Sequence, residues 1–189
     1  MKEIKILDTA FAHGTSLGTG DLKINPKYVK FDRNVDKNYN GWIIFTENNI
    51  MKFSLYPNAK KIAWLLEPKV INQQSYNNIR SIAHNFEKIF THDTDLIDND
   101  KFLFYPFGGC WIYPHDRKIY DKTKNVSIIA STKRMTDGHQ MRHEIIEKFG
   151  NQIELFGRGY KTIENKLEGL KDFRYQIVVE NTKKGLLVY

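Results

Sequence analysis

A glutamate at the end of an apolar run is the residue whose position best suits proton transfer. Glu67 closes the run KIAWLLE and is followed by Pro68. If the run is a buried strand, the carboxylate stands at its carboxyl-terminal tip, where α/β proteins place reacting groups. A carboxylate there can act as a general base and take a proton from a hydroxyl group. The alternative is that Glu67 only caps the helix that follows the strand.

Basic residues follow a second apolar run and suit a phosphate group. The run VSIIAS ends at Ser131, and Lys133, Arg134 and Arg142 stand in the segment after it, which contains a glycine. Backbone N–H groups at a helix N-terminus favour phosphate. An arginine one turn into such a helix can offer two donors to a diphosphate. The alternative is a basic helix face that is simply solvated.

Two histidines and a cysteine are further residues that could bind a metal or react. His139 and His143 are four residues apart, which is the spacing of two ligands on one helix face. No acidic or cysteine ligand follows at a recognised distance, so we expect a capping or surface role for both and no metal. Cys110 is the single cysteine and cannot form an internal disulfide, so we expect a structural thiol.

Two glycine-containing segments could approach a ligand closely. The segment 12–21 (AHGTSLGTGD) has three glycines but lacks the Gly-Lys-Ser/Thr ending of a P-loop. We expect it to be a connection, with a binding loop as the alternative. The segment 157–160 (GRGY) sets an arginine between two glycines after the run QIELF. Taken alone, this motif indicates little.

Short apolar and β-branched runs predict the strands that would position these residues. Residues 71–86 carry apolar side chains near helical spacing, and a shorter helix is expected to end before Pro57. Strands that alternate with helices predict an α/β domain with a largely parallel sheet. The expected strands of this first half are IKIL at 4–7, WIIFT at 42–46, KIAWLL at 61–66, KIFTH at 88–92 and FLFYPF at 102–107.

A polar, charged stretch at 113–125 predicts a domain boundary near residue 120. The pattern after it is typical of a βαβαβ unit, half of a Rossmann-type domain that binds nucleotides at the carboxyl ends of its strands. We therefore expect an α/β domain over 1–120 and a partial nucleotide-binding domain over 121–189. The second domain would contain strands at 125–131, 152–157 and 173–180, with helices at 139–150 and 162–170.

Charge and composition limit the possible partners. The net charge of +7 and the pI of about 9.3 favour anions. Because no block of five or more basic residues forms a nucleic-acid arm, we favour a nucleotide and keep a nucleic-acid-binding protein as a rival reading. No apolar run reaches the roughly 18 residues of a membrane span. The N-terminus lacks the apolar stretch of a signal peptide, so we expect a cytoplasmic protein.

The order of elements in the second half resembles the donor-binding domain of glycosyltransferase family 10, the α1,3-fucosyltransferases. The resembling elements are KNVSIIAST, a helix containing Arg142, IELFGRGY, the lysine-bearing KTIENKLEGL and DFRYQIVVENT. The last is the most specific, because in the family an aromatic-rich strand ends in Phe/Val-Glu-Asn-Ser/Thr. In the first half, IAWLLEP is similar to the acceptor-domain strand that carries the family's general base.

The resemblance implies a GT-B-type architecture of two Rossmann-like domains, the second one incomplete, with a nucleotide-sugar between them. It implies that Arg142 holds the diphosphate and that Glu67 is the general base. The nucleotide would be lined by Ser131, Glu180 and Asn181. The implied reaction is an inverting transfer of a sugar, fucose from GDP-fucose, to a glycan hydroxyl. No metal or other cofactor would be needed.

The last residues depart from the family pattern. After Asn181 the chain reads TKKGLLVY, where the family continues with a Tyr-x-Thr-Glu-Lys motif that contacts the ribose and phosphates. We therefore expect a truncated donor site, impaired transfer and a homo-oligomer that covers the exposed edge of the second domain. The alternative function is a non-catalytic nucleotide- or glycan-binding or assembly module that retains the fold.

Overall fold

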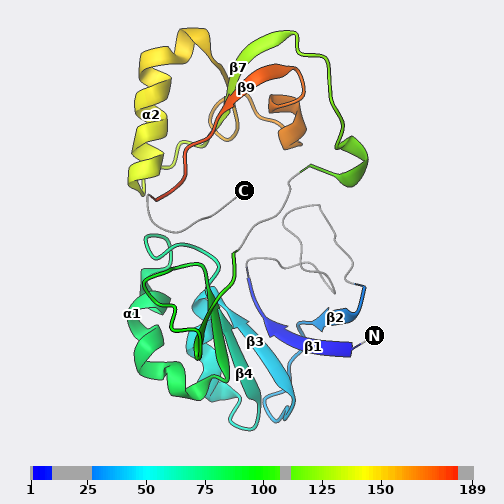
Figure 1. Cartoon of the computed structure of the whole chain (residues 1–189), viewed down its shortest axis with the longest axis vertical. Coiled ribbons are helices and arrows are strands. Elements are labelled where there is room, and N and C mark those ends of the chain that lie inside the picture. Colours follow the sequence, from blue (N-terminus) through cyan, green and yellow to red (C-terminus); the bar gives the residue numbers. More distant parts are fainter. Residues whose placement is uncertain (1, 10–26, 107–111, 183–189) are drawn as a thin grey trace. The chain divides into compact units, whose positions relative to one another are not determined.

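The computed structural model describes residues 2–9, 27–106 and 112–182 (Figure 1). The described residues before 107 belong to one compact unit, and those after 111 belong to another. Each unit has its own parallel sheet. Cys110 and the segment 12–21 lie outside the described residues, as does the end of the chain after 182.

The first unit is built on six parallel strands in the order β2-β1-β3-β4-β5-β6. The β-branched and aromatic residues of WIIFT suit a strand in the middle of such a sheet. Because all strands run the same way, their carboxyl ends meet at one edge. The strands are β1 (Lys2–Leu7), β2 (Val29–Asp32), β3 (Trp42–Thr46), β4 (Lys60–Trp64), β5 (Lys88–Thr91) and β6 (Phe102–Phe104).

Helical segments after β3 and β4 supply the rest of the first core. A 3-10 helix, Glu47–Leu55, follows β3, and α1 (Gln73–Ile82) follows β4 and continues into the 3-10 turn Ala83–Asn85. The side chain of Asn72 caps α1 by accepting a hydrogen bond from the Ser75 N–H at 3.4 Å. The core that these helices form with the sheet includes Ile43, Phe45, Ile50, Ala63, Ile79, Phe86 and Ile89.

The second unit has three parallel strands in the order β8-β7-β9. Thr136 caps α2, because its side chain accepts a hydrogen bond from the His139 N–H at 3.2 Å. Ile145 and Ile146 of α2 pack against the core cluster formed by Ile128, Ala130 and Ile153. The elements are β7 (Lys124–Ile129), α2 (Asp137–Phe149), β8 (Glu154–Phe156), β9 (Phe173–Ile177) and the 3-10 helices Pro114–Asp116, Gly150–Gln152 and Lys166–Gly169.

The α/β class with parallel sheets is confirmed, and each expected strand is present, β3 with the expected bounds and the others with shifted ends. The short strand β2 was not expected, because its four residues, VKFD, contain only two apolar side chains and are too few for their alternation to stand out. The helix expected over 162–170 is shorter than predicted. It is a single 3-10 turn that Asn165 and Glu168 start with a capping box.

The two units divide earlier than the expected boundary at residue 120. The division lies between residues 106 and 112, so the polar stretch before β7 belongs to the second unit. That stretch contains the 3-10 helix Pro114–Asp116 and lines a pocket together with residues 167–171. In the described part of the chain, every helix is too short or too polar to span a lipid bilayer.

Candidate functional site

The first sheet has a topological switch point at β1, where the order of the strands along the chain reverses direction across the sheet. The chain passes from β1 to β2 on one side and then to β3 on the other side of β1. In open α/β sheets, ligands bind outside the strand ends at such a point. Asp8 follows β1 and Glu47 follows β3, so two carboxylates stand at this position. The Thr46 hydroxyl donates a hydrogen bond to the Leu7 carbonyl at 3.3 Å and links the two strand ends.

Glu47 is a buried carboxylate with three hydrogen-bond donors. Its Oε1 accepts from the backbone N–H groups of Leu66 at 2.5 Å and Glu67 at 2.9 Å, and its Oε2 accepts from the Asn72 amide at 2.5 Å. Burial raises the pKa of the Glu47 carboxyl, the three donors oppose this shift, and the negative charge of Glu67 adds to it.

The backbone of Glu47 is also unusual. Its φ of 51° lies in the left-handed region, which residues other than glycine rarely adopt. Such a conformation persists where the surroundings impose it, and it is frequent at functional sites. Here the surroundings include the Ser75 hydroxyl, which donates to the Glu47 carbonyl at 3.1 Å.

Glu67 lies three residues beyond the end of β4 and is half-buried. Its backbone N–H donates to Glu47, and its carbonyl accepts a hydrogen bond from the Tyr76 hydroxyl at 3.0 Å. The backbone of the candidate base is therefore fixed on both sides. The residue that caps α1 is Asn72 and not Glu67, so the capping alternative finds no support in this geometry.

Two further polar groups are buried after strands of the first sheet. His92 follows β5 and is 1% exposed, and its Nδ1 has no hydrogen-bond partner among the described residues. Burial lowers the pKa of the His92 imidazole, while the charge of Asp93 opposes the shift. Asp8 forms an ion pair with Arg33, which follows β2, at 2.8 Å. Asp8 is thus tied to the edge strand, away from the Glu47–Glu67 contact.

The carboxyl edge of the second sheet brings together three of the expected donor-site residues. Arg142 donates from Nε to the Val179 carbonyl at 2.9 Å and also from its terminal nitrogen to that carbonyl. The same nitrogen donates to the Asn181 Oδ1 at 2.9 Å. Burial raises the pKa of the Glu180 carboxyl, and the charge of Arg142 opposes the shift. Arg142 therefore binds the segment after β9 that carries Glu180 and Asn181.

The N-terminus of α2 lies directly against this segment. A Cβ at Gly138, in the first turn, would stand 1.8 Å from the Glu180 carbonyl oxygen, so only glycine allows this approach. Ser131 is half-buried and Lys133 is exposed in the loop between β7 and α2. Lys133 and Arg142 both lower the pKa of His139, after the larger effect of burial. Positive charge is thus concentrated at the start of α2.

His139 and His143 are buried inside the second unit and not on its surface. The His139 Nδ1 is 2.8 Å from the Thr136 hydroxyl at the helix cap, in keeping with the expected capping role. The His143 ring contacts the Lys133 carbonyl at 3.1 Å and the Tyr160 hydroxyl at 3.3 Å. Both rings are occupied by protein groups. The described residues contain no cluster of three or more histidine, cysteine or acidic side chains that could hold a metal.

The GRGY segment is part of the same edge. Gly157 has φ +108°, and a Cβ there would lie 2.1 Å from the Ala130 carbonyl oxygen. Gly159 has φ +92°, and its Cβ would lie 2.3 Å from the Thr132 side chain. The two glycines therefore let the loop after β8 pack closely on the loop after β7, which carries Ser131 and Lys133.

Sequence reasoning missed Glu47, Asp8 and His92. Each follows an apolar strand directly, which is the same signal that identified Glu67. Glu47 was instead taken as the first residue of the helix predicted from the stretch ENNIMKFSLYPNAK. Applying the strand-end argument to the expected strands at 4–7 and 42–46 would have found Asp8 and Glu47. His92 was counted as the last residue of the expected strand at 88–92, whereas β5 ends at Thr91.

Comparison of the chain with family models, with curated proteins and with solved structures found no match.

Proposed function

We propose that the protein is an inverting glycosyltransferase that uses a sugar nucleotide as donor. The carboxyl edge of the second sheet is the donor site, and Glu67 in the first unit is the general base. The observation that carries the proposal is the grouping of Arg142, Glu180 and Asn181 beside the N-terminus of α2. A helix N-terminus with nearby cations favours a diphosphate.

Arg142 contributes to this site mainly by positioning. It donates hydrogen bonds to Val179 and Asn181, so it holds the segment on which Glu180 and Asn181 stand. Its charge still adds to the positive potential that a diphosphate would meet. Lys133 has an exposed ammonium group and is the residue we assign to direct phosphate contact.

The proposed reaction is a single displacement. The Glu67 carboxylate takes the proton of an acceptor hydroxyl, and the oxygen attacks the anomeric carbon of the donor sugar. The bond from that carbon to the diphosphate breaks, and its electron pair leaves with the nucleoside diphosphate. Lys133, Arg142 and the α2 N-terminus stabilise the charge that develops on the leaving group. Attack from the face opposite the diphosphate inverts the anomeric centre.

The identity of the donor is the part of the proposal that rests on sequence resemblance alone. The segments KNVSIIAST and DFRYQIVVENT are similar to family 10 fucosyltransferases, so GDP-fucose is the donor we propose. The GT-B-type arrangement of two Rossmann-like domains belongs to the same proposal. The two parallel sheets, one in each unit, are compatible with it.

Titration calorimetry with GDP and GDP-fucose tests the donor site. We expect Lys133→Ala to weaken GDP binding several-fold and Arg142→Ala to weaken it by about tenfold or more, because both remove positive charge and the second also loosens residues 179–181. Arg174→Ala is the matched control, since Arg174 is exposed in β9 and bonds Asn125 near the amino end of β7. Unchanged affinity in both site variants would remove them from the donor site.

Transfer assays with Glu67→Gln test the base. Glutamine keeps the size of the side chain and cannot accept the proton, so transfer should fall by about a hundredfold or more while GDP-fucose binding stays nearly intact. Retained transfer would refute the assignment of Glu67.

The engagement of Arg142 within the protein favours one alternative, a module that binds the nucleotide without chemistry. That alternative predicts tight GDP-fucose binding by the unmodified chain and no transfer to any glycan hydroxyl tested. Binding that depends on salt and ignores the guanine base would instead favour a nucleic-acid-binding protein.

A further inference from the structure

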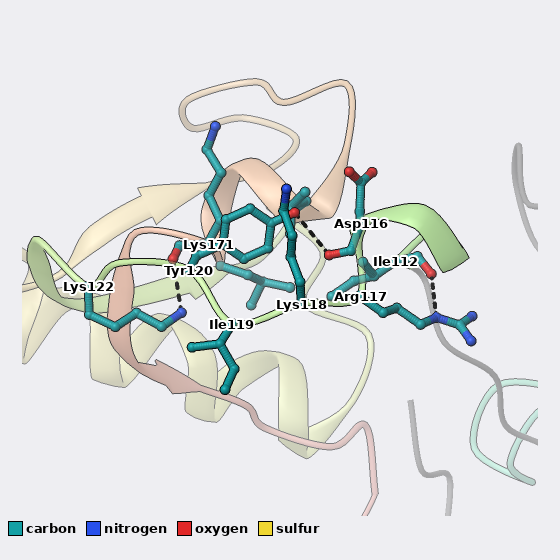
Figure 2. Close-up of a pocket in the computed structure, with 10 residues that line it drawn as sticks. Ile112, Asp116, Arg117, Lys118, Ile119, Tyr120, Lys122 and Lys171 are labelled. Atoms are coloured by element: carbon teal, nitrogen blue, oxygen red, sulfur yellow. Dashed lines mark hydrogen bonds between the residues drawn. The ribbon is translucent and has the colours of Figure 1, made fainter.

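The second unit contains a pocket that the proposed function does not use. It lies between the segment 112–122 and the turn 167–171 and has a volume of about 450 Å³ (Figure 2). Ligand pockets commonly fall in the range of roughly 300–1,000 Å³. Residues 120–122 lead into β7, and residues 170–171 lead into β9. The pocket is therefore at the amino ends of these strands, whereas the proposed donor site is at their carboxyl ends.

Four cationic side chains line this pocket. The described residues provide no carboxylate that forms an ion pair with any of the four. Two of them are held by backbone carbonyls: the Arg117 Nε donates to Ile112 at 3.0 Å, and the Lys122 Nζ donates to Lys171 at 2.9 Å. One carboxylate, that of Asp116, also lines the pocket, and its Oδ2 lies 3.4 Å from the His115 Nε2. The four cations therefore outnumber the acidic lining residue, and two of them are fixed in place. The four cations are Arg117, Lys118, Lys122 and Lys171.

The same pocket offers an aromatic ring and aliphatic surface. The Tyr120 hydroxyl donates to the Asp116 carbonyl at 2.9 Å, which fixes the ring. The Lys118 Nζ lies 5.3 Å from the centre of that ring. Figure 2 shows the ammonium groups of Lys118 and Lys171 pointing to the same side of Tyr120. Aliphatic surface comes from Ile112, Ile119, Leu167 and Leu170.

The exposed apolar surface is itself an argument for a ligand with an apolar part. Ile119 is 97% exposed, and covering an isoleucine side chain is favourable by roughly 1.5–3 kcal/mol. A small inorganic anion would neutralise the lysines and leave this surface wet. A neutral apolar molecule would cover the surface and bring no negative charge to the four cations.

We propose that this pocket binds a small organic anion with an apolar body, such as an aryl or alkyl carboxylate, sulfonate or phosphate ester. The anionic group would lie between Lys118 and Lys171, near the other two cations of the pocket. The apolar body would cover Tyr120 and Ile119. This site is separate from the donor site, and it does not depend on the proposed glycosyltransferase activity.

A fluorescence titration with anilinonaphthalene sulfonate, which combines a sulfonate with two aromatic groups, tests the site. The unmodified chain should bind one probe molecule per chain. The double variant Lys118→Glu/Lys171→Glu should bind it about tenfold or more weakly, because two attractive charges become repulsive. The matched control is Lys69→Glu/Lys148→Glu, which makes the same change in net charge at two exposed lysines outside the pocket and should stay within about twofold.

Two single variants keep the proposal testable if the double variant fails to fold. Lys118→Ala removes one cation and Tyr120→Ala removes the ring, and each should weaken probe binding several-fold while the far-ultraviolet circular dichroism is unchanged. Probe binding that is unaltered in these variants would overturn the proposal. The proposal would also be overturned if sodium sulfate displaced the probe at matched ionic strength and Tyr120→Ala did not change probe binding. The site would then bind simple anions only.

The GDP affinity of the double variant should equal that of the unmodified chain. This measurement separates the test of the pocket from the test of the donor site.

Discussion

At the scale of single residues, Glu47 holds the backbone that carries Glu67. Its carboxylate accepts two consecutive backbone N–H groups, from Leu66 and Glu67, and the Asn72 amide. A buried polar group that loses its partner costs about 1–3 kcal/mol. The three donors that Glu47 satisfies would all lose their acceptor together, in a part of the structure from which water is largely excluded.

Glu47→Ala should therefore lower the free energy of unfolding of the first unit by about 3 kcal/mol. Chemical denaturation followed by tryptophan fluorescence measures this, because Trp42 and Trp64 lie in the first sheet. Glu87→Ala is the matched control, since the Glu87 side chain is exposed and its substitution should change stability by less than about 0.5 kcal/mol. Equal effects of the two substitutions would contradict the role given to Glu47.

Because the pKa of Glu47 is raised, the decrease in the free energy of unfolding caused by Glu47→Ala should depend on pH. The pKa of the Glu47 carboxyl is higher in the folded state than its unfolded value of 4.5. Such a group contributes stability that is fully present below pH 4.5. This contribution is lost as the pH rises through the pKa of the folded state. The destabilisation by Glu47→Ala should therefore be larger near pH 4.5 than at pH 7. A cost that grows with pH would mean that the hydrogen bonds outweigh the burial of the charge.

The sequence predicts some residues of the candidate site and not others for a physical reason. Glu67 was found because a strand-end position depends only on local pattern. The contacts of Arg142 could not be found in this way, because its partners Val179 and Asn181 lie 37 and 39 positions away. Their meeting depends on the packing of α2 beside β9, which no local pattern specifies. The sequence predicts an arginine that contacts a diphosphate, and in the structure Arg142 is half-buried and donates to the Val179 carbonyl and the Asn181 side chain.

At the scale of elements, the loops after β7 and β8 pack closely against each other. The Ala130 N–H donates to the Phe156 carbonyl at 2.8 Å, and Gly157 follows at once with φ +108°. The Gly157 N–H then donates to the Lys161 carbonyl at 2.8 Å and closes the turn. Any side chain at this glycine would meet the Ala130 carbonyl and force the two loops apart.

Gly157→Ala should destabilise the second unit by about 3 kcal/mol, because it adds a clash to a strained backbone conformation. Gly150→Ala is the matched control. Gly150 has φ −55°, and a Cβ there meets no atom within 4 Å, so alanine should be neutral or stabilise by about 0.4–1 kcal/mol. Thermal unfolding followed by circular dichroism compares the two. A Gly157→Ala protein as stable as the Gly150→Ala protein would show that the loops tolerate separation.

Element type and position were predicted well where hydrophobic periodicity is strong. WIIFT gives β3 with the expected bounds, and α2 spans Asp137–Phe149 where a helix over 139–150 was predicted. The prediction failed where neighbours decide the structure. β2 has little strand pattern of its own and is held by pairing with β1, including the contact of Lys5 with Asp32 at 2.5 Å.

At the scale of the whole molecule, the two units have separate hydrophobic cores. The first core includes Ile89 of β5, which is 0% exposed, and among the described residues its members precede residue 107. The second includes Ile128 of β7, which is 1% exposed, and its described members follow residue 111. A sequence boundary near 120 was expected because the stretch 113–125 is polar. The stretch belongs to the second unit, where the Lys122 side chain donates to the Lys171 carbonyl and the Thr123 N–H donates to the Asp172 carbonyl.

Because the cores are separate, we expect a cavity in one unit to lower the stability of that unit and to leave the stability of the other unchanged. Ile89→Ala should cost the first unit about 3 kcal/mol, as expected for a buried isoleucine replaced by alanine. Native-state hydrogen exchange resolves the effect by element: amides of β3 to β5 should exchange faster, and those of β7 and β9 should keep their rates. Ile128→Ala is the reciprocal variant and should reverse the pattern. If either substitution accelerated exchange equally in both sheets, the units would unfold as one cooperative body, and stability would have to be assigned to the chain as a whole.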